Sequence, residues 1–157
     1  MTARRARTSD LHAVLALYRE LRPHDPVLPT PETELLWARV HDSPGSLIVV
    51  CEHQGRIGAT CMLATVANLA SGGRPIGFIE HVITTAPLRG KGLAEACLRF
   101  AVDEAWRQGC CKVVLLSGAQ RLQAHRLYQR IGFDGDAERG FVIKQSTEIS
   151  MKSASSA

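Results

Sequence analysis

The chain has 157 residues, of which 45% are apolar and 22% charged, a balance typical of a soluble globular domain. No apolar run reaches the ~20 residues of a membrane-spanning helix, and no apolar stretch follows the basic N-terminus, so we expect neither a membrane partner nor a secretory signal. The net charge of +4 is spread along the chain and only 5% of residues are aromatic, which favours an anionic cosubstrate over nucleic acid as partner.

Cysteine and histidine spacing predicts neither a metal site nor a disulfide framework. The five cysteines are an odd number and contain no Cys-x-x-Cys pair. The histidines are also scattered, without the spacing of metal ligands. We therefore expect a cytoplasmic protein that holds no metal.

The N-terminal half reads as helices followed by a strand hairpin. In chain order its predicted elements are a strand at 3–7, a helix at 9–21, a loop at 22–30, a helix from Thr30 to about His41, and strands at 46–52 and 57–66. Apolar residues at helical spacing define the first helix, and three prolines define the loop. Gly58 is a candidate bulge in the second strand of the hairpin.

The C-terminal half alternates strands and helices. Its predicted elements are a strand at 76–84, a helix from Gly92 to Gly109, a strand at 112–116, a helix at 120–131, a strand at 140–145 and a disordered tail at 150–157. The strand at 112–116 is short and wholly apolar in its middle, as expected for a strand buried on both faces. Phe133 is expected to enter the strand that follows the last helix.

This order of elements predicts an α/β (α+β) fold with one mixed central sheet flanked by helices. The helix between 76–84 and 112–117 has the length of a crossover, so these two strands should be parallel neighbours. We expect a single domain over 1–150, followed by the tail at 151–157.

The turn Arg89-Gly90-Lys91-Gly92-Leu93-Ala94 opens the central helix and has the chemistry of an anion site. The first N–H groups of a helix have no partner within the helix and carry partial positive charge. Glycines allow close approach, and two basic side chains add full charges, so a diphosphate would fit. The alternative is an ordinary basic turn. The spacing matches neither a Walker A loop nor the Gly-x-Gly-x-x-Gly dinucleotide turn.

Two motifs together give the chain a family resemblance. Arg89, Gly92 and Ala94 match the signature Arg/Gln-x-x-Gly-x-Gly/Ala. About 30 residues later, Ala124, Tyr128, Gly132 and Phe133 match a second pattern, Ala-x-x-x-Tyr-x-x-apolar-Gly-Phe, in register. Both motifs, in this order, resemble the GNAT superfamily of N-acetyltransferases, and the resemblance implies a GNAT-like acyl-CoA N-acyltransferase fold with acetyl-CoA as cosubstrate.

The resemblance implies where acetyl-CoA would lie. The pantetheine arm would follow the strand at Val82, Ile83 and Thr84, and the diphosphate would rest on the turn residues Arg89, Gly90, Lys91, Gly92, Leu93 and Ala94. Arg121 stands where many members have Asn, and it could instead meet an anionic part of CoA. In the resembled family, the region around 22–42 covers the acceptor site.

Tyr128 is the predicted proton donor to the departing thiolate. A phenol with an ordinary pKa of ~10 is protonated at neutral pH, which suits this role. The resemblance places the tyrosine beside the CoA sulfur. The alternative is a purely structural tyrosine on the buried helix face, where most helical tyrosines lie.

Glu80 is the second catalytic candidate, because a carboxylate among Phe78, Ile79, Val82 and Ile83 is costly to bury without a partner. It could equally form a salt bridge to an arginine. His81 is a further candidate base or a packed histidine, and the two should not face the same side of the strand unless a bulge intervenes. Many members of the resembled family use a water chain instead.

The resemblance implies transfer of an acetyl group to a primary amine by direct attack in a ternary complex. The Glu-x-Val pattern at Glu80 resembles amino-sugar phosphate acetyltransferases, which favours a small-molecule acceptor. Alternatives are a protein or peptide acetyltransferase acting on Lys or an N-terminus, and a non-catalytic acyl-CoA-binding domain. Dimers are common in the family, so a homodimer is also an open expectation.

Overall fold

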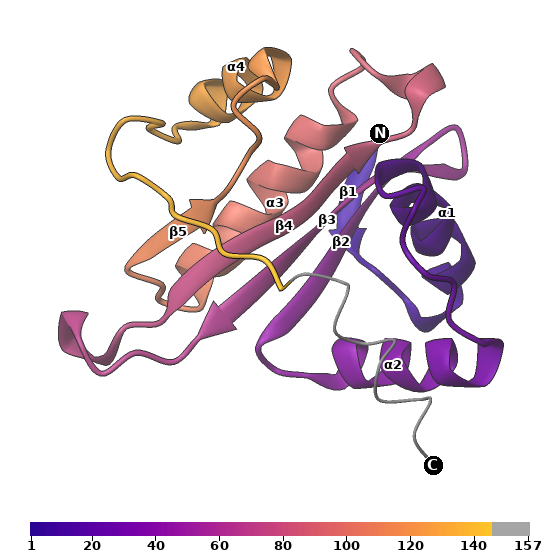
Figure 1. The fold of residues 1–157 in the computed structure, drawn as a ribbon, viewed down its shortest axis with the longest axis horizontal. Helices are drawn as coiled ribbons and strands as arrows, with labels where there is room; N and C mark the ends of the chain where they lie inside the picture. The colour runs from indigo at the N-terminus through magenta and orange to yellow at the C-terminus, as the bar shows by residue number, and fades with distance from the viewer. Residues whose placement is uncertain (146–157) are drawn as a thin grey trace.

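A five-stranded sheet forms the centre of the protein in the computed structural model, which describes residues 1–145 (Figure 1). Its strands are β1 (Thr2–Arg5), β2 (Ser46–His53), β3 (Arg56–Val66), β4 (Ile76–Thr84) and β5 (Lys112–Leu115). They lie in chain order across the sheet, antiparallel except for the parallel pair β4–β5. The predicted mixed sheet and the predicted parallel pairing are therefore confirmed.

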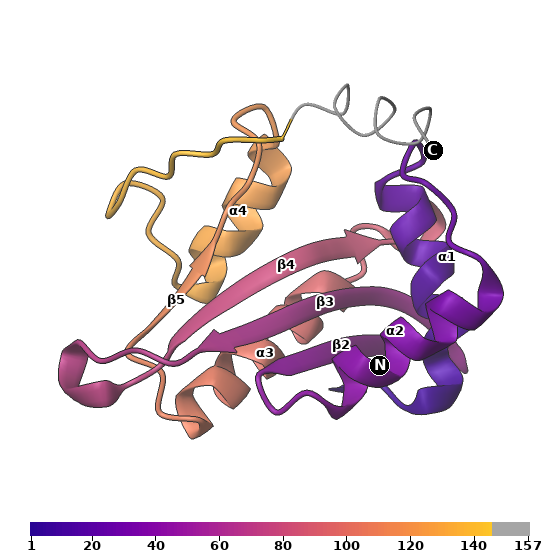
Figure 2. The ribbon, with the colours of Figure 1, turned by 60° about the horizontal axis from the view of Figure 1, so that its bottom comes forward.

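Helices cover both faces of the sheet (Figures 1 and 2). They are α1 (Leu11–Leu21), α2 (Thr30–Asp42), α3 (Leu93–Arg107) and α4 (Leu122–Ile131). Alternate residues of β2 point to opposite sides because the side-chain period of a strand is two. Val49 and Cys51 join the core under α3, whereas Ile48 and Val50 join the core under α1 and α2. None of the helices within residues 1–145 is long and apolar enough to cross a membrane.

Gly58 is the residue at which β3 bulges away from β2, as predicted. Cys51 pairs with Ala59 and Glu52 pairs with Ile57, so Gly58 is left without an opposite residue. A Cβ atom at Gly58 would collide with Leu88 and would lie 2.7 Å from a methyl carbon of Leu93. Only glycine therefore lets the strand contact the turn that precedes α3.

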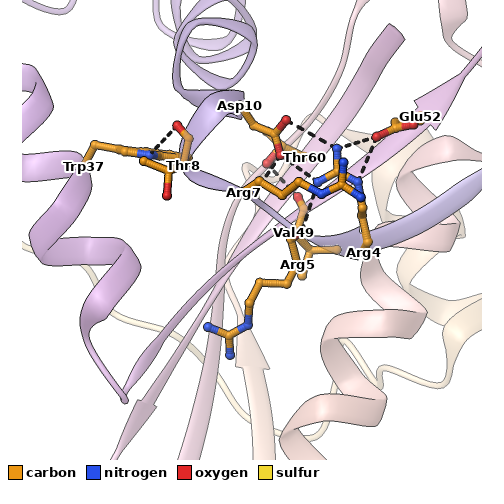
Figure 3. A network of polar contacts seen from close by, with 9 residues as sticks. All are labelled: Arg4, Arg5, Arg7, Thr8, Asp10, Trp37, Val49, Glu52 and Thr60. Atoms are coloured by element: carbon orange, nitrogen blue, oxygen red, sulfur yellow. Dashed lines mark hydrogen bonds and ion pairs between the residues drawn. The ribbon is translucent and has the colours of Figure 1, made fainter. Parts of the chain in front are cut away.

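An ion-pair network fixes the start of α1 to the sheet (Figure 3). The Arg4 guanidinium on β1 contacts the carboxylates of both Asp10 and Glu52, with Nη1 2.6 Å from Asp10 Oδ2. Asp10 also accepts the Arg7 backbone N–H at 2.7 Å. The hydrogen bonds with Arg4 are the main reason that the pKa of the Asp10 carboxyl lies below its usual range.

Both C-terminal helices end in a glycine with positive φ. Gly109 (φ 77°) follows α3, and the Cys110 N–H returns to the Ala105 carbonyl at 3.0 Å. Gly132 (φ 111°) ends α4, and the Phe133 N–H returns to the Tyr128 carbonyl at 3.0 Å. This is the hydrogen-bond pattern of a Schellman motif, and both helix ends agree with the sequence analysis.

Three expectations for the C-terminal part were wrong. Residues 140–145 form no strand, and Phe133 enters none, because its backbone N–H completes the end of α4. The strand β5, which pairs only with β4 in the described chain, is not buried on both faces: Val113, Val114 and Leu115 are half-buried, and Leu116 is 53% exposed. The predicted tail at 150–157 lies outside the described residues.

Candidate active site

The strands β4 and β5 separate midway along β4 and leave a cleft. Their last paired residues are Ile79 and Leu115, after which β5 ends while β4 continues to Thr84. Residues 80–84 of β4 therefore have no strand partner on this side within residues 1–145. Backbone N–H and C=O groups at such an edge are free to bind an extended ligand.

A cavity of about 340 Å³ occupies this separation. Four parts of the chain line it, and they include Arg22 after α1, Glu80, His81 and Val82 from β4, Ser117 and Arg121 from the segment after β5, and Tyr128 from α4. The fold thus brings together both predicted catalytic residues, Glu80 and Tyr128. It also places two of the predicted acetyl-CoA contacts, Val82 and Arg121, at the same cavity.

A bulge in β4 changes which side chains face this cavity. Thr60 pairs with Ile83 and Met62 with Glu80, so one residue of β3 stands opposite both His81 and Val82. His81 has φ 55°, in the left-handed region that non-glycine residues seldom adopt. Because the bulge interrupts the alternation of the strand, neighbouring Glu80 and His81 both line the cavity.

Tyr128 lies at the inner side of the site, with only 6% of its surface exposed. Its ring packs edge-on against Phe133, with centroids 6.3 Å apart. Burial raises the pKa of the Tyr128 hydroxyl, and the nearby Arg121 charge and Ser117 hydroxyl offset part of this rise. The hydroxyl therefore stays protonated across the neutral range.

Glu80 is exposed to the cavity rather than buried under a partner. No ion pair to Glu80 exists among residues 1–145, so the alternative of a salt bridge to an arginine is wrong for the described chain. An unpaired carboxylate here is available to a cationic ligand.

The turn before α3 leaves the helix N-terminus open. Gly90 (φ 77°) and Gly92 (φ 84°) take the left-handed conformations that bring the chain into the helix. The first helical hydrogen bond runs from the Ala96 N–H to the Gly92 carbonyl at 3.0 Å, and no side chain of the described residues caps the helix. The N–H groups before Ala96 are therefore available to an anion.

Two of the residues predicted to contact acetyl-CoA, Ile83 and Leu93, can do so only through their backbone groups. The Leu93 side chain is 1% exposed and the Ile83 side chain 6% exposed, because both belong to the core. Their peptide groups nevertheless lie in the open turn and on the free edge of β4.

Arg89 is held by a residue that the sequence analysis did not select. Glu20, near the end of α1, accepts hydrogen bonds from the Ala86 N–H at 2.7 Å and the Thr85 hydroxyl at 2.8 Å. It also pairs with Arg89 at 3.3 Å, and Arg89 Nε donates to the Thr84 carbonyl at 3.2 Å. Glu20 therefore ties α1 to the segment that leads from β4 into the glycine turn.

A second cavity, of about 330 Å³, lies between α1, α2 and the loop that joins them. Arg22 and His81 line both cavities. The family resemblance points to the region around 22–42 as cover of an acceptor site, and this region supplies part of the wall. The cavity itself could not be predicted, because its walls come from α1, α2, β2, β3 and β4, which meet only in the folded chain.

A model of the acetyltransferase (GNAT) family matches residues 11–133, so the chain belongs to this family. The match spans the two helices of the N-terminal half and both motifs, Arg89–Ala94 and Ala124–Phe133. The fold and family predictions are therefore confirmed.

Solved structures and curated relatives agree with this assignment. A putative acetyltransferase from Agrobacterium tumefaciens str. C58 is 36% identical, with a TM-score of 0.86 over 92% of this chain and 100% of that one. Glucosamine 6-phosphate N-acetyltransferase from Trypanosoma brucei brucei is 33% identical over 79 residues, 50% of this chain and 52% of the relative. The chain spans 40–52% of the length of the curated relatives it matches.

One more distant structure has the same fold. Aminoglycoside N-acetyltransferase AAC(6')-Iy, solved in complex with CoA, is 14% identical, with a TM-score of 0.76 over 91% of this chain and 93% of that one. At this identity the likeness concerns the fold alone.

Proposed function

We propose that this protein is an acetyl-CoA-dependent N-acetyltransferase that acts on the primary amine of a small molecule. The observation that carries the proposal is the cleft between β4 and β5, where Tyr128, Glu80 and the free edge of β4 meet. Membership of the acetyltransferase family supports the reaction class. The relative named as a glucosamine 6-phosphate N-acetyltransferase supports a small-molecule amine as acceptor.

The residues present fit acetyl-CoA. The free N–H groups at the start of α3, with Lys91 beside them, suit the diphosphate, because helix N-termini and cations both stabilise anions. The unpaired edge of β4 at 82–84 suits the amide groups of the pantetheine arm, which can hydrogen-bond as an added strand does. Arg121, at the cleft, adds a further positive charge.

Acetyl-CoA supplies a thioester whose acetyl group an amine can attack. Backbone N–H groups on the free edge of β4 would stabilise negative charge on the acetyl oxygen. Tyr128 donates its hydroxyl proton to the sulfur as the carbon–sulfur bond breaks. Its raised pKa keeps this proton in place at neutral pH.

The amine must lose a proton before it can attack. Glu80 is the proposed group that attracts the protonated amine into the cleft and accepts its proton, directly or through water. Its carboxylate is exposed at the cavity and free of ion pairs among residues 1–145. His81 lies on the same side because of the β4 bulge and is neutral at pH 7, since burial lowers its pKa.

The test is acetyl-CoA turnover with a panel of acceptors. Turnover is measured as release of the CoA thiol, and the product is identified by mass spectrometry. The panel contains small primary amines, a lysine peptide and a peptide with a free N-terminus. We expect acetylated small amines and little peptide product. Faster turnover of peptides would support a protein acetyltransferase, and acetyl-CoA binding without any acetylated product would support a non-catalytic acyl-CoA-binding domain.

A further inference from the structure

The second cavity is built mainly of apolar side chains. Leu15, Val27, Leu28 and Leu36 line it and are all more than a third exposed, with Val27 at 69%. Single exposed apolar residues are normal on a protein surface, but four that share one hollow mark a binding site. At about 330 Å³ the hollow has the size of a small-ligand pocket.

Buried residues continue the apolar wall inward. Trp37 and Ile48 line the cavity and are 7% and 8% exposed. The indole N–H of Trp37 already donates to the Thr8 carbonyl at 3.1 Å (Figure 3). The ring, which lines the cavity, therefore offers it an apolar surface. Met62 adds a flexible apolar side chain that can adapt to a ligand.

Two lining residues carry buried polar atoms without a hydrogen-bond partner among the described residues. They are the Tyr18 hydroxyl and His81 Nδ1, whose rings lie 5.2 Å apart between centroids. An unpaired buried polar atom is costly, and a bound molecule that supplies one hydrogen-bonding group removes this cost. The pair therefore suits a ligand with one polar group on an otherwise apolar body.

The apolar cavity adjoins the proposed acetyl-transfer cleft. Arg22 and His81 line both, and His81 stands at the β4 bulge next to Glu80. A molecule whose body fills the apolar cavity therefore has its end beside His81, at the border of the cleft. The charged lining residues Arg19, Arg22 and Asp25 all come from the end of α1 and the loop after it.

We propose that the acceptor is a primary amine on an apolar body, an arylalkyl or alkyl amine, whose body lies between α1 and α2. This inference rests on the proposed function, of which it names the substrate class. A polyhydroxy sugar phosphate would place hydroxyls against Leu36, Trp37 and Met62, where they lose water without gaining a partner. An arylalkyl or alkyl body instead gains affinity, because it buries apolar area against the aromatic and aliphatic walls.

The first experiment compares kcat/KM for phenethylamine, 4-phenylbutylamine and octylamine with that for glucosamine 6-phosphate, at saturating acetyl-CoA. We expect the apolar amines to be preferred by about tenfold or more, the discrimination that one or two apolar contacts give. Preference for glucosamine 6-phosphate would overturn the inference while the proposed function stands.

A matched pair of variants then locates the binding surface. Leu36 lines the cavity and is 46% exposed, whereas its neighbour Leu35 is 68% exposed and lines neither cavity. Leu36→Glu should raise KM for 4-phenylbutylamine about tenfold with KM for acetyl-CoA unchanged, because it places a charge against the apolar body. Leu35→Glu should change neither constant. Equal effects of the two variants would overturn the inference.

A binding measurement keeps the inference testable if turnover is absent. In calorimetric titrations with 4-phenylbutylamine, we expect binding to the wild type and to Leu35→Glu, and lost or much weaker binding to Leu36→Glu. Binding with this pattern but no acetylated product would contradict the proposed function and leave the cavity as an amine site. No binding to the wild type, with or without CoA, would overturn the inference itself.

Discussion

The two cavities that meet at the β4 bulge differ in what builds them. The cleft between β4 and β5 is lined by the free edge of β4, the buried phenol of Tyr128, and charged as well as apolar side chains, and Tyr128 belongs to the second family motif. The cavity between α1 and α2 is mostly apolar and comes from the N-terminal half, apart from His81 on β4. The proposed function and the proposed acceptor class thus assign chemistry and acceptor choice to different parts of the chain.

The two cavities can be altered by substitution largely independently of each other. Under the proposal, residues of α1, α2 and their loop that line only the apolar cavity can vary the acceptor without disturbing the strand edge, Tyr128 or the helix N-terminus. Leu21, which lines the cleft, Glu20, which holds Arg89, and Arg22 and His81, which line both cavities, are the exceptions. Substitutions that line only one cavity should therefore change KM for one substrate, acetyl-CoA or the acceptor amine. Substitutions of Arg22 or His81, which line both cavities, should change KM for both.

The largest effect is expected from Gly92→Asp, at the open N-terminus of α3. A carboxylate there repels the diphosphate and occupies its site, although Asp tolerates positive φ and suits the start of a helix. Acetyl-CoA at a hundredfold excess over Kd should stabilise the wild type by about 2.7 kcal/mol in thermal unfolding and this variant not at all.

The control for Gly92→Asp is Gly55→Asp. Gly55 has a similar φ of 76°, lies in the β2–β3 hairpin, and leaves open space around a Cβ atom added to it, with no neighbouring atom within 4 Å. This variant should keep the full stabilisation by acetyl-CoA. Undiminished stabilisation of Gly92→Asp would mean that the diphosphate binds elsewhere.

Tyr128→Phe should lower kcat by about 10²-fold, the contribution of a typical general acid. The phenyl ring keeps the packing against Phe133, so the Kd for acetyl-CoA should not change. Because burial raises the pKa of Tyr128, wild-type activity should show no alkaline loss from this group below pH ~10. Unchanged kcat in the variant would make Tyr128 structural.

Asp10→Ala should lower the free energy of unfolding by about 1–3 kcal/mol, since it removes the Arg4 ion pair and the Arg7 N–H acceptor that fix α1, one wall of the apolar cavity. The loss should shrink with acid: the pKa of Asp10 is lowered, so its stabilisation is present above the ordinary pKa and disappears as pH falls through the native value. Urea unfolding of the wild type and the variant at several pH values measures the loss of stability and its pH dependence.

Asp103 offers the matched control, an exposed carboxylate on α3 with no hydrogen bond or ion pair within residues 1–145. Asp103→Ala should change the free energy of unfolding by less than about 0.5 kcal/mol. A comparable loss in both variants would show that the Asp10 network adds nothing specific.

The smallest effect concerns the junction. Burial lowers the pKa of His81, with Arg22 adding to this effect and Glu80 and Asp25 opposing it. The native state favours the neutral imidazole, so the free energy of unfolding should fall as pH drops from the ordinary pKa of ~6.5 through the native value. The loss is about 1.4 kcal/mol for each pH unit by which the native pKa lies below the ordinary one. His81→Asn, which tolerates positive φ, should lose less stability between pH 7 and pH 5 in urea unfolding. An identical pH dependence would contradict this.

Local patterns predicted most of the fold. Helix ends at Gly109 and Gly132 and the bulge at Gly58 each follow from a few neighbouring residues, and the parallel pairing of β4 with β5 follows from the crossover helix between them. The strand predicted at 140–145 was wrong: these residues form no ladder with β5, although β5 has no second strand partner in the described chain, and Phe141 is 88% exposed.

The site could be predicted only in part. The motifs identify Tyr128 and the turn at 89–94, because their chemistry depends on one helix and one turn. The left-handed conformation of His81 depends on the register of β3 against β4, and the role of Glu20 depends on α1 lying beside Arg89. The apolar cavity needs five elements to meet, so no single stretch of sequence reveals it.

Whether the protein binds acetyl-CoA at all is decided by a calorimetric titration of the wild type with acetyl-CoA, repeated in the presence of CoA. The cleft between β4 and β5 and the open N-terminus of α3 predict one site with micromolar affinity for which CoA competes. No binding at millimolar acetyl-CoA would contradict the proposed function and leave residues 89–94 as an ordinary basic turn.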